Sequence, residues 1–137
     1  MGLVVFDADV LIAHLNADDS QHQAGVERVR RALDSRDRRL LSLVNYSEVL
    51  VGPAATLGSD GTARTKAALR VLGIETIPVD TAIAEKAAEV RARIKLKLPD
   101  AYAVATALSA ARADDDVRLE SFDKQVVRAF TALRRRG

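Results

Sequence analysis

Four acidic residues that lie far apart in the sequence are the strongest candidates for chemistry. Each one follows a short apolar run or begins a helix-like segment, and they are Asp7, Glu48, Asp100 and Asp123. Carboxylates that gather at one site repel each other unless a cation neutralises them. Because the ligands would be oxygens and the chain has no cysteine, the cation that fits is Mg²⁺ or Mn²⁺. Such an ion activates water and stabilises charge on phosphate oxygens, so the pattern predicts phosphodiester hydrolysis.

Each acid also has a structural interpretation when it is taken alone. Asp7 or Asp9 could cap a short first helix. Asn45 and Glu48 have the spacing of a capping box, and Asp100 lies in a first helical turn, where the helix dipole favours negative charge. For any single residue, a role in capping a helix and a role in a metal site both stay open. Only the joint placement of the four acids favours a shared site.

Short apolar runs alternate with longer helix-like segments along the chain. The predicted strands are residues 3–6, 40–44, 74–79 and 117–122. The predicted helices are residues 9–16, 20–36, 46–58, 80–95, 99–113 and 123–130, with a break expected near Gly52 and Pro53. Residues 58–73 are predicted to be a loop followed by a helix that ends at Gly73. This alternation predicts an α/β fold, a parallel sheet covered by helices on both faces. Ligands bind outside the carboxyl ends of such strands, where the four acids are expected to lie.

Composition indicates one globular domain, residues 1–137, with 48% hydrophobic and 29% charged residues. The chain has no apolar run long enough for a membrane span and no signal-peptide pattern at its start. The absence of cysteine is compatible with the cytoplasm, where we expect the protein to act. A net charge of +2, with clustered arginines, permits binding of a nucleic acid but does not require it.

Four segments together resemble the PIN-domain ribonucleases, in particular the VapC-type toxins of bacterial toxin–antitoxin pairs. The segments are "VVFDADVLIAHL", "VNYSEVL", "LPDAYAVATALSAA" and "LESFDKQVVRAF", and they span nearly the whole chain in the order and at the spacing of that family. The most specific of them is "LPDAYAVATAL", followed by "SEV" after the second predicted strand.

The resemblance implies a function and a role for each candidate residue. By this resemblance, the metal-binding acids are Asp7, Glu48, Asp100 and Asp123. Ser121 would orient a carboxylate or a water, and Asp9 would have a supporting role. It further implies Mg²⁺- or Mn²⁺-dependent cleavage of RNA, a homodimer, and inhibition by a small VapB-type antitoxin. Without metal, acids crowded in this way should include at least one with a raised pKa.

Two segments depart from the pattern of that family. The family closes with a fifth strand after the last helix, but "TALRRRG" is short and ends in charge, so we expect four to five strands. Residues 52–64 are rich in glycine and small residues, and we expect a mobile segment near the cleft there.

Two other functions compete with the ribonuclease. "VVFDADVL" also resembles the first motif of haloacid-dehalogenase-type phosphatases, in which Asp7 would be the nucleophile and Asp9 the general acid or base. That interpretation leaves Glu48 and "PDAYAVATAL" without a role, and the later lysine and acidic pair of that family are missing. A non-catalytic, receiver-like domain that binds metal through the same acids is the third possibility.

Overall fold

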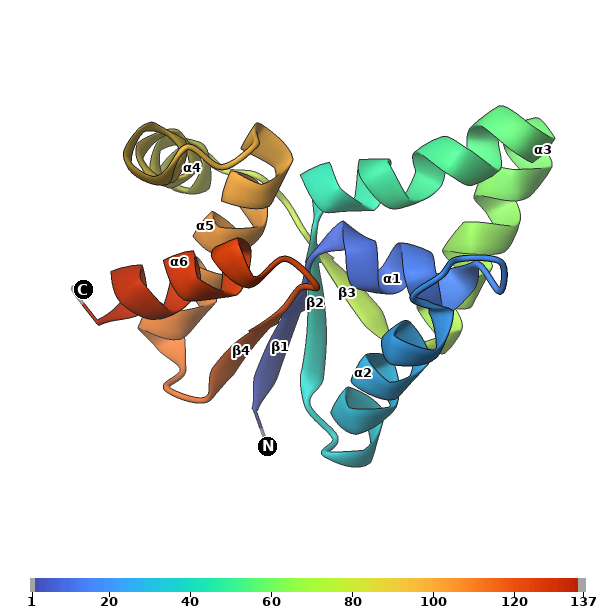
Figure 1. The fold of residues 1–137 in the computed structure, drawn as a ribbon, viewed down its shortest axis with the longest axis horizontal. Helices are drawn as coiled ribbons and strands as arrows, with labels where there is room; N and C mark the ends of the chain where they lie inside the picture. The colour runs from blue at the N-terminus through green and yellow to red at the C-terminus, as the bar shows by residue number, and fades with distance from the viewer. Residues whose placement is uncertain (1, 136–137) are drawn as a thin grey trace.

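Four parallel strands form the central sheet in the computed structural model, which describes residues 2–135. They are β1 (Leu3–Phe6), β2 (Arg38–Ser42), β3 (Ile74–Ile77) and β4 (Val117–Glu120). Their order across the sheet is β3-β2-β1-β4 (Figure 1). Val5 in the central strand β1 pairs with Leu40 on one side and Leu119 on the other. The predicted parallel α/β fold is therefore confirmed, with four strands among residues 2–135.

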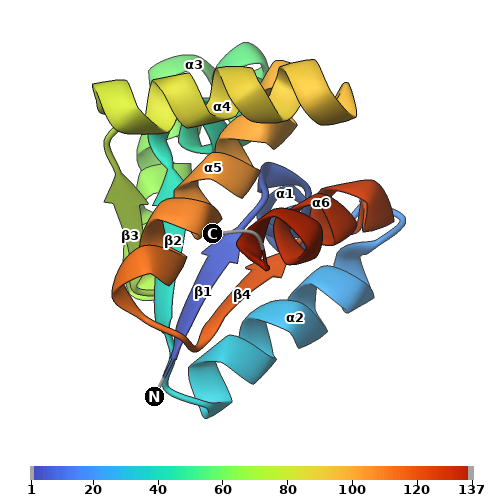
Figure 2. The same cartoon turned by 90° about the vertical axis from the view of Figure 1, so that its left-hand side faces the viewer.

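Six helices cover the two faces of the sheet. They are α1 (Ala8–Leu15), α2 (His22–Asp34), α3 (Leu43–Val71), α4 (Thr81–Ile94), α5 (Leu98–Ala113) and α6 (Lys124–Arg134). Helices α1, α2 and α3 pack on one face, and α4, α5 and α6 pack on the other (Figures 1 and 2). Among residues 2–135, no helix is long and apolar enough to cross a membrane.

Strand β1 separates two hydrophobic cores because its side chains alternate between the faces of the sheet. Leu3 and Val5 pack with the core under α4, α5 and α6. Val4 and Phe6 pack with the core under α1, α2 and α3. All four side chains are buried, as expected for a strand covered on both faces. This burial fixes the end of β1, and with it the position of Asp7.

Helix α3 corrects two predictions made from the sequence. The helix continues through Pro53, where a break was predicted, and its backbone leaves helical geometry at Gly58, whose φ is 61°. Glycine adopts such a left-handed conformation at little cost, which explains why the bend lies there. The segment 52–64, predicted to be mobile, is helical on both sides of this bend. A Cβ at Gly61 would collide with the carbonyl of Pro53, so the two parts of α3 approach each other closely at this glycine.

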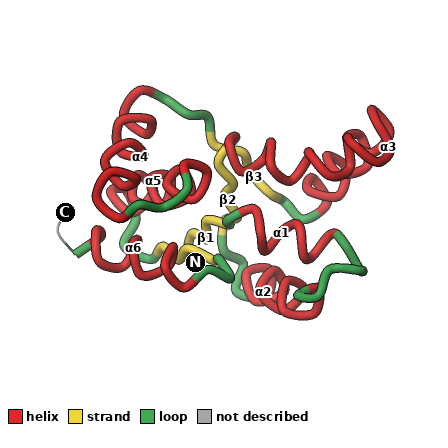
Figure 3. The backbone as a smooth tube through the Cα atoms, turned by 45° about the horizontal axis from the view of Figure 1, so that its top comes forward, coloured by secondary structure: helices red, strands yellow, loops and turns green. Residues whose placement is uncertain are grey.

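Aspartates cap three of the helices that begin near the carboxyl edge of the sheet. Asp7 accepts a hydrogen bond from Ala8 N–H at the start of α1, and Asp123 accepts one from Gln125 N–H at the start of α6. Asp80 caps α4 through Ile83 N–H at 2.8 Å, as predicted. Each of these helices follows the carboxyl end of a strand after a short connection, α1 after β1, α4 after β3 and α6 after β4 (Figure 3).

Candidate active site

Asp7 is the most buried of the candidate acids, with 4% of its surface exposed. Its Oδ1 accepts a hydrogen bond from Ala8 N–H at 2.8 Å, and its Oδ2 accepts one from the Ser121 hydroxyl at 2.9 Å. Burial raises the pKa of Asp7 to about 7, and the charges of Asp9 and Asp100 act in the same direction. No lysine or arginine among residues 2–135 forms an ion pair with Asp7.

Asp9 is held against the end of β4 by two donors. Its Oδ2 accepts a hydrogen bond from Phe122 N–H at 2.9 Å and a longer one from Ser121 Oγ at 3.3 Å. Its Oδ1 is buried without a hydrogen-bond partner among residues 2–135. Burial raises the pKa of Asp9, and the charge of Asp123 adds to the increase. Asp7 is the cap of α1, so the alternative in which Asp9 caps that helix is wrong.

Ser121 links three of the acidic residues at this edge. Its hydroxyl donates toward Asp7 and Asp9, and its oxygen accepts a hydrogen bond from Asp123 N–H at 3.1 Å. The residue is 4% exposed, so these contacts are shielded from water. A hydroxyl in this position orients two carboxylates and the start of α6 together.

Glu48 is oriented by a buried asparagine on the same helix. Asn45 Nδ2 donates to Glu48 Oε1 at 2.8 Å and to the carbonyl of Pro99 at 3.0 Å. Asn45 does not cap α3, since that helix begins at Leu43 and Ser42 is its cap. The Asn45 side chain therefore ties Glu48 to the first turn of α5, where Asp100 lies.

Charge interactions connect Asp100 to the other acids. Burial raises the pKa of Asp100, and the charges of Glu48, Asp123 and Asp9 raise it further, against an opposite effect of Lys97. Asp123 itself is exposed at the start of α6. The structure therefore brings the four predicted acids and Asp9 into one electrostatically coupled group, and the expected raised pKa values are present at Asp7, Asp9 and Asp100.

The acidic group has the oxygen ligands of a hard-cation site, but its side chains are not arranged around one point as metal ligands are. All of its side-chain donors are oxygens, and the buried Oδ1 atoms of Asp9 and Asn45 have no hydrogen-bond partner among residues 2–135. No three acidic or histidine side chains in that part of the chain are already arranged to hold a metal ion. The donor set and its uncompensated charge fit Mg²⁺ or Mn²⁺, whereas a shared metal on all four acids stays a prediction.

Asn45 is the residue whose role sequence reasoning missed. The spacing to Glu48 was assigned to a capping box, although the hydrogen bond that matters joins two side chains within the helix. The available signal was a polar side chain at the start of an apolar segment, directly after a predicted strand. Its second contact, to Pro99, spans 54 residues and has no counterpart in local sequence.

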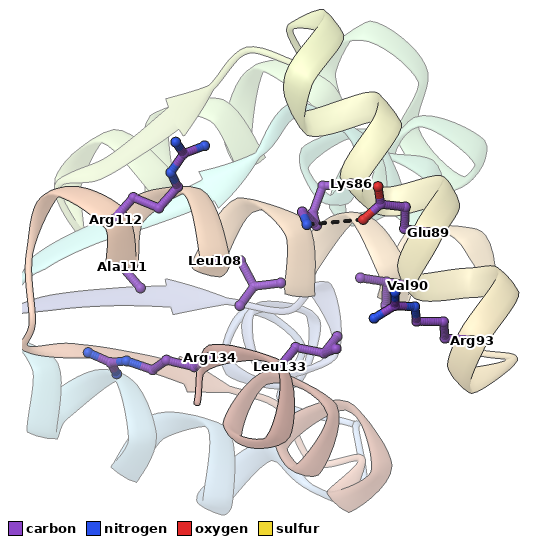
Figure 4. Close-up of a pocket in the computed structure, with 9 residues that line it drawn as sticks. All are labelled: Lys86, Glu89, Val90, Arg93, Leu108, Ala111, Arg112, Leu133 and Arg134. Carbon is purple, nitrogen blue, oxygen red and sulfur yellow. Dashed lines mark hydrogen bonds and ion pairs between the residues drawn. The ribbon is translucent and has the colours of Figure 1, made fainter. Parts of the chain in front are cut away.

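A separate groove lies toward the far end of α5, between α4, α5 and α6 (Figure 4). Its volume is about 400 Å³, and its apolar lining is Val90, Leu108, Ala111 and Leu133. Leu108 and Arg112 lie about 12–18 Å along the helix axis from Asp100, at about 1.5 Å per residue. This groove is therefore not part of the acidic group.

Comparison with known proteins decides the family. Residues 4–130 match the PIN domain. The chain belongs to the PIN domain family. A search of curated proteins finds no significant match.

Three solved structures share the fold of this PIN domain. A toxin–antitoxin complex from Klebsiella pneumoniae is 28% identical, with a TM-score of 0.60 over 88% of this chain and 86% of that one. VapC20 of Mycobacterium tuberculosis, a sarcin–ricin loop cleaving toxin, is 18% identical, with a TM-score of 0.69 over 92% and 94%. FitAcB from Neisseria gonorrhoeae is 20% identical, with a TM-score of 0.64 over 94% of each chain.

Proposed function

We propose that this PIN domain is a Mg²⁺- or Mn²⁺-dependent endoribonuclease and the VapC-type toxin of a toxin–antitoxin pair. The observation that supports the proposal most directly is the buried Asp7 carboxyl, which has acidic neighbours and no ion-pair partner among residues 2–135. A carboxylate in that position is costly unless a cation joins it. The solved toxin structures with the same fold support the assignment to this class.

The proposed roles follow the hydrogen bonds of each residue. Asp7, Glu48, Asp100 and Asp123 would hold the metal, and a bound Mg²⁺ or Mn²⁺ would supply water activation and charge stabilisation on the phosphate. Each oxygen of Asp7 accepts one hydrogen bond from the protein and keeps a lone pair for a cation. Ser121 and Asn45 are positioning residues, since they orient Asp7 and Glu48.

The partners and location are part of the same proposal. We propose that residues 1–137 act as one domain in the cytoplasm, that two copies form a homodimer, and that a small VapB-type antitoxin inhibits the enzyme. The Klebsiella pneumoniae neighbour is a toxin–antitoxin complex, which supports the antitoxin partner. The net charge of +2 is compatible with RNA as the polyanionic substrate.

The competing functions have less support. The match to the PIN domain removes the main ground for a haloacid-dehalogenase-type phosphatase. A receiver-like domain has the strand order 2-1-3-4-5, whereas this sheet has the order β3-β2-β1-β4. The PIN-type ribonuclease is the remaining assignment that gives a role to all four acids.

A cleavage assay on mixed RNA tests the proposal. The wild-type protein should cut RNA with Mg²⁺ or Mn²⁺, lose the activity in EDTA, and leave a small phosphomonoester intact. Asp100→Asn should be inactive, whereas Asp60→Asn, a matched change at an exposed site on α3, should cut RNA normally. Equal activity of Asp100→Asn and wild type, or cleavage in EDTA, would disprove the proposed site.

A further inference from the structure

A second groove adjoins the acidic group on the side of β4. It lies between α2, the end of β4 and α6, and its volume is about 490 Å³. Ser121 and Phe122 line it, and the same two residues hold Asp9 through the Ser121 hydroxyl and the Phe122 N–H. The groove therefore begins at the residues that orient the candidate active site, unlike the groove between α4, α5 and α6.

The side chains around this groove are mainly cationic. Four positive side chains line it, against the single carboxylate of Glu120, and they are Arg28, Arg31, Lys124 and Arg128. Arg31, Lys124 and Arg128 are exposed, and none of the three forms an ion pair within residues 2–135. The adjacent acids would attract a metal cation, whereas these positive side chains would attract an anion. We therefore expect the groove to bind an anionic partner.

Arg28 is held in place before any ligand arrives. Its Nη1 donates to Glu120 Oε1 at 2.8 Å and to the carbonyl of Ser121 at 3.3 Å, and its guanidinium lies 5.2 Å from the centre of the Phe122 ring. Both hydrogen bonds use Nη1, so Nε and Nη2 have no partner in the described part of the chain. A planar guanidinium fixed with an available edge suits a phosphate group.

We infer that this groove, named here the α2–α6 groove, binds the sugar–phosphate backbone of the RNA next to the bond that is cut. The inference rests on the proposed ribonuclease function and adds the surface that holds the substrate. An acidic edge repels a polyanion, and the adjacent cations offset that repulsion while leaving the acids free to bind metal. Arg28 covers the Phe122 ring, so the contact is to phosphates and not by stacking of a base.

Charge removal in the two grooves gives a matched test. The double variant Arg31→Ala/Arg128→Ala removes two exposed cations from the α2–α6 groove. The control Arg93→Ala/Arg112→Ala removes two exposed cations from the groove between α4, α5 and α6. Binding of a short single-stranded RNA is measured in EDTA, where it is not cut, by fluorescence anisotropy over a series of salt concentrations.

We expect the first double variant to bind RNA about 10-fold more weakly, and the slope of log K against log salt to fall by about 1.4, because each lost phosphate contact removes about 0.7. The control should match wild type in both measurements. With Mg²⁺ present, the first variant should raise KM and leave kcat unchanged, which a loss of folding or of the catalytic site would not do. Arg28→Lys keeps the positive charge but loses the planar, two-pronged set of guanidinium donors, and it should weaken RNA binding less than the double variant does.

Three results would overturn the inference, and they separate it from the proposed function. RNA that is cut normally but bound equally by both double variants and wild type would reject the groove and keep the ribonuclease. Tighter binding of poly-glutamate than of RNA, with the same dependence on Arg31 and Arg128, would make the groove a docking site for an acidic protein. Wild-type protein that neither binds nor cuts RNA would reject both proposals.

Discussion

Two buried aspartates at opposite ends of the sheet differ in what surrounds their charge. Asp37 precedes β2, Asp7 follows β1, and each is 4% exposed. Asp37 accepts hydrogen bonds from Gly2 N–H at 3.0 Å and from the Arg118 guanidinium at 2.9 Å. Both donors to Asp7 are uncharged, namely the Ala8 N–H and the Ser121 hydroxyl.

The pKa values of the two groups shift in opposite directions as a result. Burial acts to raise the pKa of Asp37, but the hydrogen bond from Gly2 and the hydrogen bond and charge of Arg118 bring it below its usual value. Burial raises the pKa of Asp7 to about 7, and neighbouring acids add to the effect. The exposed fractions are the same, but Asp7 lies deeper in the protein, so its stronger burial and the Arg118 charge beside Asp37 together separate the two pKa values. Asp37 is a paired structural group, whereas Asp7 has no ion-pair partner among residues 2–135, which is what the proposed metal site predicts.

Exchanging each aspartate for asparagine should separate activity from stability. Asp7→Asn should lower RNA cleavage at least about 1,000-fold, as losses of catalytic groups do, and should not lower stability in EDTA. Asp37→Asn should keep cleavage and lose about 1–3 kcal/mol of unfolding free energy, because Arg118 loses its close ion pair with Asp37 and keeps only the longer one with Glu120. Urea unfolding and cleavage rates measure both effects. The comparison fails if Asp37→Asn is the inactive variant.

The pH dependence of stability in EDTA should reflect Asp7. Its pKa is about 7 in the folded state and 3.8 in the reference state, so the folded protein retains a proton that the unfolded chain releases between these values. The free energy of unfolding should therefore fall as pH rises from about 4 to about 7, by up to about 4 kcal/mol. Asp37 acts oppositely, since its lowered pKa gives stability that is lost as pH falls through the folded-state value.

Urea unfolding across this pH range, compared with Asp7→Asn, isolates the contribution. The decrease between pH 4 and pH 7 should be smaller in the variant than in the wild type, and the raised pKa values of Asp9 and Asp100 account for the part that remains. An unchanged slope in Asp7→Asn would mean that another group titrates there, and that Asp7 is not the uncompensated charge.

Replacing Asn45 should lower the affinity for the metal ion and not only the stability of the fold. Asn45→Ala frees Glu48 and the carbonyl of Pro99 from their shared donor. We expect about a 10- to 100-fold loss in the apparent affinity for Mg²⁺, as is typical for residues that orient metal ligands. Asn16→Ala, at the exposed end of α1, is the control and should leave that affinity unchanged. Equal affinity in both variants would remove Asn45 from the site.

Ser121→Ala should have the smallest effect of this series. The hydroxyl lowers the pKa of Asp7, so its removal should shift the pH profile of cleavage upward and reduce the rate less than about 10-fold at pH 7. A pH–rate profile in Mg²⁺ measures the shift. Ser121→Thr retains a hydroxyl and should restore the profile; failure of that rescue would point to packing as the role of Ser121.

The fold could largely be predicted from the sequence because its determinants are local. The run "LVVF" is fully buried as β1, and Asp80 caps α4 as its position suggested. Helix α3 was the exception, because proline is a strong breaker in local statistics. The buried residues Gly61, Thr65 and Leu69 recur every four positions, which is the helical signal that outweighs the glycines of that segment.

The candidate site could be predicted in its residue types but not in its connections. The strand-end rule located Asp7 and Asp123 near the carboxyl edge. The hydrogen bond between Ser121 and Asp7 joins residues 114 positions apart, and Arg118 reaches Asp37 over 81 positions. Such contacts depend on how strands pair, so the sequence could not show which aspartates have a cationic partner.

A calorimetric titration of Mn²⁺ into metal-free protein tests the central claim most directly. Wild type and Asp37→Asn should bind the ion with the same affinity, and Asp7→Asn should bind it at least about 10-fold more weakly. Saturation to about 100 times Kd should also stabilise the wild type by about 2.7 kcal/mol. Equal binding by Asp7→Asn and wild type would show that the uncompensated charge of Asp7 is not there to hold a cation.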